Sequence, residues 1–244
     1  MKNSPLKIKV LKFVAEQRFV TAEDICKRDF WRSEKLDTAR VTMNQLDLAR
    51  TRFGNVQYGV RYIDKPTVLN LLKEYYHDME GFKIRPIHLH QIPHALGINH
   101  IRNTLEKSQK IQIKQWWSEE YIRSLPEGSR EGMNLRRKIP DALFWQVRKD
   151  GTERKYFLEY ERSLKSNERY GEIFKFYEER HDLKEKSVLY VCETEFIKKR
   201  LMDLEEKLEK KGRLKTKGEY FQFVTMEEFN QSFNSTNQKE AGDE

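Results

Sequence analysis

Two strand-like segments around one tight turn restrict the fold of this chain more than any other feature of its sequence. Residues 139–147 and 154–162 are rich in aromatic and β-branched side chains, and Asp150-Gly151 between them is a turn signal. We expect the two segments to pair as an antiparallel hairpin. Both carry apolar residues on both faces, which is typical of strands inside a sheet that is covered on both sides.

The hairpin predicts a group of carboxylates at one of its ends. If the loop is centred on Asp150, the numbers of facing residues add up to 300, and Asp141 then faces Glu159. Glu161 shares that face because it lies two residues further along the strand, whereas Tyr160 points to the other side. A shift of the register by one residue would scatter the three carboxylates.

Carboxylates in a covered sheet are costly unless positive charge compensates them. Divalent metal ions are one compensation, because carboxylate oxygens suit Mg or Mn. Bound metal ions can polarise a phosphodiester and generate hydroxide near neutral pH. The alternative is that the carboxylates lie at solvated strand ends and pair with nearby basic residues, namely Arg136, Arg137, Lys138 or Arg162.

Residues 5–78 have the pattern of three helices, a short strand pair and a further helix. Thr21 is expected to cap the second helix, the third helix to run from about Ser33 to Arg50, and the strand pair to occupy residues 54–63. This is the order of a winged helix-turn-helix, whose third helix enters the DNA major groove while the wing rests on the backbone. Its expected DNA-binding residues are Arg40, Asn44, Gln45, Arg50, Arg52 and Arg61. A small helical domain or a protein–protein adaptor is the alternative.

The formal net charge of +8 favours a polyanionic partner. Residues 1–65 hold 14 Lys and Arg against 8 Asp and Glu, and residues 198–217 hold 9 against 4, so much of the surplus lies in these two segments. The second segment would line a DNA backbone or simply solvate a helix. Only two cysteines are present, far apart, which excludes a disulfide scaffold or a cysteine-rich zinc site and suits a reducing cytosol. No apolar run predicts membrane insertion.

A histidine-rich segment follows the first unit. His88-Leu89-His90 has the form of the metal-binding histidine pair of rolling-circle relaxases, because positions i and i+2 of a strand share a face. Such enzymes also use a nucleophilic tyrosine, for which Tyr75 or Tyr76 is available. The alternative is a polar inter-domain segment. Further on, Glu119 follows tandem tryptophans and is a candidate metal ligand at the edge of a site.

The remaining pattern predicts a helix at 164–182, a buried strand at 188–192, an amphipathic helix at 196–211, a strand at 220–224 and a short helix at 226–229. The expected fold class is α+β or α/β, with a first domain at residues 1–80, a catalytic domain at 81–231 and a disordered tail at 232–244.

Pro140-Asp141, the hairpin and Glu159-Tyr160-Glu161 resemble the active-site core of the PD-(D/E)XK nuclease superfamily, the fold of restriction endonucleases. The usual third residue of that motif is lysine, and Glu161 stands in its place. The run from Leu158 to Ser163, with Tyr170, Lys175 and Tyr177 downstream, is similar to the replication-relaxation group of plasmid proteins. Over about residues 5–225 the chain resembles a MobC-type mobilisation relaxase.

The resemblance implies an N-terminal winged helix-turn-helix followed by a restriction-endonuclease-like mixed β-sheet flanked by helices. It implies that Asp141 and Glu159 hold Mg or Mn, and that Glu161 is a further ligand or positions the attacking water. Lys175, or as second choice Lys165, would replace the motif lysine. Such a relaxase nicks double-stranded DNA at a plasmid transfer origin in the bacterial cytoplasm, with an accessory or coupling mobilisation protein and a secretion channel as partners.

Two other hypotheses stay open. The chain could be a non-catalytic DNA-binding regulator with a degenerate nuclease fold, in which the carboxylates are dispensable. It could also be a histidine-pair, tyrosine-dependent nickase, which would leave a covalent protein–DNA adduct.

Overall fold

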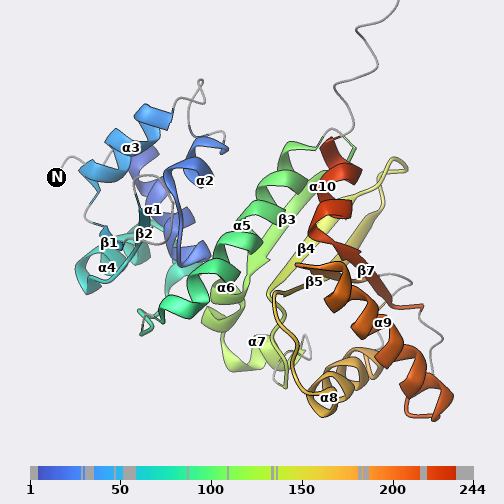
Figure 1. Ribbon diagram of the computed structural model, residues 1–244. Helices are drawn as coiled ribbons and strands as arrows, with labels where there is room; N and C mark the ends of the chain where they lie inside the picture. The colour runs from blue at the N-terminus through green and yellow to red at the C-terminus, as the bar shows by residue number, and fades with distance from the viewer. Residues whose placement is uncertain are drawn as a thin grey trace, which may run out of the picture. The chain divides into compact units, whose positions relative to one another are not determined.

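The computed structural model describes residues 5–28, 30, 36–46, 48–51, 59–86, 88–108, 110–132, 135, 137–180, 183, 187–214 and 219–234. The chain packs as two compact units (Figure 1). The first contains residues 1–103 and 117–130, and the second contains residues 104–116 and 131–244. Residues 81–103 and 117–130, which the sequence-based division assigns to the catalytic domain, therefore pack with the first unit.

The first unit begins with the predicted order of three helices, two short strands and a helix. These are α1 (Pro5–Gln17), α2 (Ala22–Cys26), α3 (Leu36–Gln45), β1 (Ala49–Thr51), β2 (Val60–Tyr62) and α4 (Pro66–Tyr75). The strands pair antiparallel, with Arg50 opposite Arg61. The third helix ends at Gln45 rather than Arg50, and β1 lies before residues 54–63, to which the sequence assigned both strands. Val10, Val14 and Ile25 are among the side chains that fill the core of this unit.

A buried capping box fixes the start of α2, as the sequence predicts for Thr21. The Thr21 hydroxyl accepts a hydrogen bond from the Asp24 backbone N–H at 3.1 Å, and the Asp24 carboxylate accepts one from the Thr21 N–H at 2.9 Å. Asn99 and Asn103 donate to the same carboxylate at 3.4 Å each. Burial raises the pKa of Asp24, and these hydrogen bonds oppose that effect. The network ties the helix that carries both asparagines to the rest of the unit.

That helix is α5 (Ile92–Lys107), and two short 3₁₀ turns precede it, η1 (His77–Met79) and η2 (Leu89–Gln91). Two short helices follow, α6 (Glu119–Ser124) and α7 (Glu127–Gly132). In the part of the chain that the structure describes, no helix is long and apolar enough to cross a membrane.

The second unit is built on a five-stranded mixed sheet, which confirms the predicted α+β fold class. Its strands follow one another in chain order, as β3 (Gln112–Ser118), β4 (Ala142–Val147), β5 (Glu153–Glu161), β6 (Val188–Cys192) and β7 (Phe221–Thr225). Strands β4 and β5 are antiparallel, whereas β5, β6 and β7 are parallel to one another. The bounds of β6 are those that the sequence predicts.

The predicted hairpin and its register are confirmed. Ala142 pairs with Leu158 and Val147 with Glu153, so the numbers of facing residues add up to 300. The turn closes through a hydrogen bond from the Gly151 N–H to the Arg148 carbonyl at 2.9 Å. Gly151 has a φ of +78°, in the left-handed region that glycine adopts at little cost.

Two helices cover the face of the sheet on which Glu159 and Glu161 lie. Helix α8 (Asn167–Glu178) packs Phe174 against Tyr190 and Phe221, and Tyr177 against Phe157. Helix α9 (Glu195–Lys210) lies beside α8 (Figure 1) and contacts β6 and β7. The last helix, α10 (Met226–Asn234), is longer than the sequence predicts and extends three residues into the segment assigned to the tail. Residues 235–244 of that tail lie outside the described residues.

Candidate functional site

Asp141, Glu159 and Glu161 meet at the end of the hairpin that lies away from its turn. Asp141 directly precedes β4, donates its backbone N–H to the Leu158 carbonyl at 3.1 Å, and accepts the Tyr160 N–H on its carboxylate at 2.7 Å. Glu159 and Glu161 are only 2% exposed. Because they alternate with Tyr160 on β5, their side chains share one face of the sheet. The fold therefore buries two carboxylates side by side and places a third next to them.

Glu159 is held by a lysine and a tyrosine. The Lys138 ammonium lies 2.9 Å from Oε1 and 3.0 Å from Oε2, and the Tyr177 hydroxyl donates to Oε1. Burial raises the pKa of Glu159 to about 7; Lys138 opposes this shift and the neighbouring Asp141 adds to it. The carboxyl group is thus close to the boundary between its charged and neutral forms at physiological pH.

Glu161 is held by Lys165, whose ammonium bonds its carboxylate from four residues further along the chain. Tyr170 supports this lysine, since its ring lies 5.4 Å from the Lys165 ammonium and its hydroxyl accepts the Lys165 backbone N–H at 3.2 Å. Burial raises the pKa of Glu161, and Lys165 opposes that shift. Of the two lysines proposed to replace the motif lysine, the structure brings Lys165 to the carboxylates.

The other proposed lysine and the fourth proposed metal ligand have contacts of their own. Lys175 is 62% exposed and its ammonium lies 3.8 Å from the Glu179 carboxylate. Glu119 belongs to the first unit, begins α6, and accepts a hydrogen bond from Arg123 at 2.7 Å. Catalytic roles for both remain predictions.

Sequence reasoning missed two members of the site. Lys138 was considered only as a partner that would neutralise solvated carboxylates; it does pair with Glu159, but that carboxylate is buried. Tyr190 pairs with Glu159 across β5 and β6 and is fully buried. Its place beside Glu159 depends on parallel pairing of distant segments, which no local pattern in one sequence reveals.

The donor type of these carboxylates fits Mg or Mn, which prefer oxygen ligands. Tyr190 adds a buried hydroxyl that has no hydrogen-bond partner among the described residues. Within those same residues, however, no three acidic, histidine or cysteine side chains are grouped so that they could hold a metal ion. Lys138 and Lys165 occupy the two glutamates instead. A metal ion bound here would have to replace a lysine on at least one of them.

The predicted DNA-reading residues of the first unit differ in their surroundings. Asn44, Gln45 and Arg50 are exposed, and Arg40 lies 3.6 Å from Asp37. Arg61 is only 8% exposed and donates to the Asn44 amide oxygen at 2.5 Å, so it links β2 to α3. Arg52 lies outside the described residues.

The histidine pair lies on a 3₁₀ turn, so the expectation that it shares one face of a strand is wrong. His88 directly precedes η2 and His90 lies within it, both exposed, with ring centroids 5.7 Å apart. Tyr75 is 54% exposed at the end of α4, and Tyr76 packs under the Lys12 ammonium at 4.3 Å. None of these contacts joins the pair to a nucleophile.

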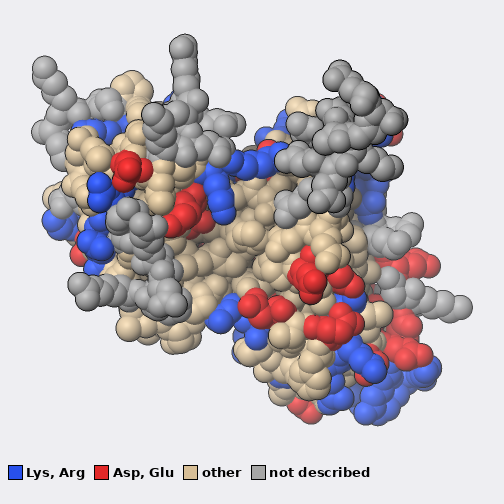
Figure 2. All heavy atoms as spheres, turned by 45° about the horizontal axis from the view of Figure 1, so that its top comes forward, with Lys and Arg blue, Asp and Glu red and all other residues tan. Residues whose placement is uncertain are grey.

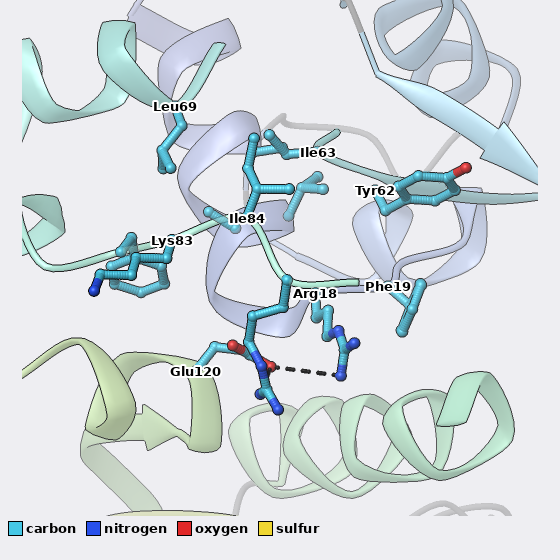
Figure 3. A pocket seen from close by; sticks show the side chains of 12 residues that line it. Arg18, Phe19, Tyr62, Ile63, Leu69, Lys83, Ile84 and Glu120 are labelled. Atoms are coloured by element: carbon cyan, nitrogen blue, oxygen red, sulfur yellow. Dashed lines mark hydrogen bonds and ion pairs between the residues drawn. The ribbon is translucent and has the colours of Figure 1, made fainter. Parts of the chain in front are cut away.

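A small pocket of about 40 Å³ in the first unit contains a half-buried ion-pair group (Figure 3). Glu120 lies 2.7 Å from Arg85 and 3.8 Å from Arg18, and Arg18 also donates to the Pro86 carbonyl at 2.6 Å. Burial raises the pKa of Glu120 and lowers that of Arg18. The space is sufficient for only a few water molecules, so we regard this group as structural.

Two basic residues of α9 are paired with acidic side chains. Figure 2 shows basic and acidic side chains intermingled over the α8–α9 end of the second unit. Lys198 pairs with Glu228 at 2.6 Å and Lys210 with Glu206 at 2.5 Å. Arg200 is exposed and has no ion-pair partner in the described part of the chain, so it is available to an anion, as are Lys199 and Lys207 of the same helix.

Arg200 lines a cavity of about 250 Å³ beside the carboxylate cluster. Lys165 and Tyr170 form part of the same wall, and Leu164, Leu201 and Leu204 provide an apolar floor. Two cations from different elements therefore face one cavity, a few residues from Glu161.

Comparison with known families identifies the chain. A family model described as "Replication-relaxation" matches residues 11–186. The chain belongs to the replication-relaxation family. The matched segment includes Asp141, Glu159 and Glu161 but ends before β6. No curated protein and no solved structure matches the chain.

Proposed function

We propose that this member of the replication-relaxation family is a metal-dependent, site-specific relaxase that nicks DNA at a plasmid transfer origin. Family membership supports a role in plasmid replication or mobilisation. The observation that carries the enzymatic part is the burial of Glu159 and Glu161 beside Asp141. Buried carboxylates reduce stability, and groups with perturbed pKa values are concentrated at functional sites.

Asp141 and Glu159 would hold Mg or Mn, with Glu161 as a further ligand or as the group that positions the attacking water. When bound, the metal would stabilise negative charge on the phosphate and make water more acidic. Tyr177 orients Glu159 through its hydrogen bond, and the Tyr160 N–H orients Asp141. Helix α8 and the aromatic side chains beneath it keep bulk water away from this end of the sheet.

Lys165 and Arg200 would hold the DNA strand beside the carboxylates. Both line the same cavity, and two positive charges at that place would bind a backbone phosphate. Lys165, which pairs with Glu161 in the structure, would be available for this task if Glu161 served as a metal ligand. The cavity would thereby bring a phosphate to the cluster without a lysine in the usual motif position.

The first unit would provide recognition of the origin. Its helix–helix–helix–strand–strand order is compatible with a winged helix-turn-helix, in which α3 enters the major groove. Asn44, Gln45 and Arg50 are exposed on α3 and β1 and are side chains that read bases or contact phosphates. A coupling protein and a secretion channel would take over the nicked strand.

Supercoiled plasmids that carry candidate origins test this proposal. The wild-type protein should convert them to the nicked form with Mg or Mn and not in EDTA, and Asp141→Asn should remove this activity. Asp150→Asn, in the exposed hairpin turn, is a matched control and should nick as the wild type does. If Asp141→Asn nicks as fast as the wild type, the assignment of the site is wrong.

A second candidate function is a DNA-binding regulator with a degenerate nuclease fold. The pairing of both buried glutamates with lysines favours it, because such pairs can simply neutralise the cluster. A regulator should bind its DNA site with unchanged affinity when Asp141 or Glu159 is replaced, and the wild type should nick no plasmid.

A further inference from the structure

Phe196 exposes an aromatic ring that the second unit does not bury. It lies in the first turn of α9 and is 71% exposed, more than any other large hydrophobic side chain that the structure describes. The rings of α8 and the sheet pack against one another, as Phe174 does against Tyr190 and Phe221. A single exposed ring is common on protein surfaces, so the meaning of this one depends on its surroundings.

A cation lies beside this ring. Arg200 follows Phe196 by four residues on α9, so the two side chains are neighbours on the helix surface, with Cβ atoms about 5–6 Å apart. Arg200 is exposed and has no ion-pair partner in the described part of the chain. An aromatic ring and a positive charge are therefore available together to one ligand.

The cavity that Arg200 lines favours an anion. Its volume is about 250 Å³, Lys165 lines it as well, and no carboxylate is among the described residues of its wall. The larger groove further along α8 and α9 differs, because Glu168, Glu172 and Glu179 line it together with lysines. A polyanion is therefore favoured at the Arg200 end of α9 and not along the whole groove.

The size of the cavity indicates which part of a nucleotide it encloses. Pockets that enclose a whole small ligand usually measure about 300–1,000 Å³, so a space of about 250 Å³ fits a phosphate and its sugar better than a complete nucleotide. The base would then lie at the mouth of the cavity, where Phe196 offers a ring one helical turn from Arg200. Bases in a duplex stack on one another, so an aromatic side chain stacks only on an unpaired base.

We propose that Phe196 and Arg200 form a binding site for one unpaired nucleotide, in which Arg200 holds the phosphate and the Phe196 ring stacks on the base. This inference rests on the proposed action on DNA but needs no metal. It adds that the strand beside the carboxylate cluster is held as a single strand. Because every base has a face on which a ring can stack, the site would tolerate any sequence. Both residues lie outside residues 11–186, which the family model matches.

Fluorescence anisotropy of labelled oligonucleotides with the full chain in EDTA tests the inference without cleavage. Three probes are used at one salt concentration: a single strand of random sequence, the corresponding duplex, and a strand of abasic nucleotides. The proteins are the wild type, Phe196→Leu, Phe196→Tyr, Arg200→Gln and Met202→Ala. Met202 is a matched control, because it is an exposed apolar residue on a different side of the same helix.

Phe196→Leu should bind the single strand about tenfold more weakly than the wild type, the loss expected for one base–aromatic stack. It should bind the duplex and the abasic strand as the wild type does, because neither offers an unpaired base. Phe196→Tyr keeps the ring, and Met202→Ala leaves the site intact, so both should match the wild type on every probe. Arg200→Gln should bind the single strand and the abasic strand more weakly by the same factor, because it loses a phosphate contact.

Equal single-strand affinities of Phe196→Leu and the wild type would overturn the inference and indicate a protein partner for the ring. An equal loss on the abasic strand would also overturn it, since that strand has no base. An unchanged affinity of Arg200→Gln for the abasic strand would overturn the phosphate contact. A wild type that binds none of the three probes would overturn the proposed function as well.

Discussion

Replacing Glu159 with glutamine should make the protein more resistant to unfolding as the pH rises. In the folded protein, burial raises the pKa of Glu159 from 4.5 to about 7. Between these two values the folded state keeps a proton that the unfolded state has released. The stability that this proton provides is complete below pH 4.5 and is lost as the pH rises to about 7. Glutamine does not titrate, so the variant lacks this loss.

The expected size follows from the shift. At about 1.4 kcal/mol for each pKa unit, a rise from 4.5 to about 7 corresponds to about 3 kcal/mol. The free energy of unfolding of Glu159→Gln, relative to the wild type, should therefore increase by about 3 kcal/mol between pH 4.5 and pH 8. A constant offset from altered contacts with Lys138 and Tyr177 does not affect this change. Other buried acids, such as Asp24, are present in both proteins, so their contributions to the pH dependence cancel in the difference.

Urea unfolding followed by tryptophan fluorescence, in EDTA and at five pH values from 4.5 to 8.5, measures this difference. Glu153→Gln is the matched control: Glu153 lies on the same strand but is exposed, with Lys114 2.5 Å away. Its stability should stay parallel to that of the wild type across the range. The reasoning is refuted if Glu159→Gln also stays parallel to the wild type, because Glu159 would then not be a buried carboxylate with a raised pKa.

Three further predictions use other parts of the structure. Lys165→Met should slow plasmid nicking at least tenfold, whereas Lys175→Met should change the rate less than twofold; equal losses would show that contact with Glu161 is irrelevant. Arg18 has a φ of +65°, so Arg18→Gly should be about 1 kcal/mol more stable to urea than Arg18→Ala, and the reverse order would contradict backbone strain there. Arg50→Ala should weaken DNA binding and reduce the slope of log affinity against log salt concentration by about 1. An unchanged slope for this variant would argue against a phosphate contact. Arg61→Ala should chiefly lower the melting temperature of the protein.

The sequence predicted the hairpin in detail because its determinants are local. Asp150-Gly151 sets the turn, and the alternation of residues fixes which side chains face each other. The register confirmed for Ala142 and Leu158 brings Asp141 to the end of the strand that carries Glu159. The capping of α2 by Thr21 was predicted for the same reason, since a capping box involves residues three positions apart.

The partners of the carboxylates could not be predicted in this way. Lys165 was second to Lys175 as the replacement for the motif lysine, because spacing alone does not show that α8 begins only at Asn167 and leaves Lys165 in the loop beside Glu161. Tyr190 reaches the cluster through pairing between β5 and β6, whose segments are separated by a helix. The hydrogen bond from Arg61 to the Asn44 amide oxygen was likewise not predicted, and a DNA contact of Arg61 stays a prediction.

The central claim is that buried carboxylates bind a metal that cuts one DNA strand by hydrolysis. It is tested most directly by incubating supercoiled origin plasmid with Mn²⁺ and wild type or Glu159→Gln, and resolving the products on a denaturing gel. We expect the wild type to produce a single-strand nick that depends on Mn²⁺ and carries no attached protein, and Glu159→Gln to produce none. Equal nicking by Glu159→Gln, or a nicked strand that stays covalently linked to protein, would contradict the account.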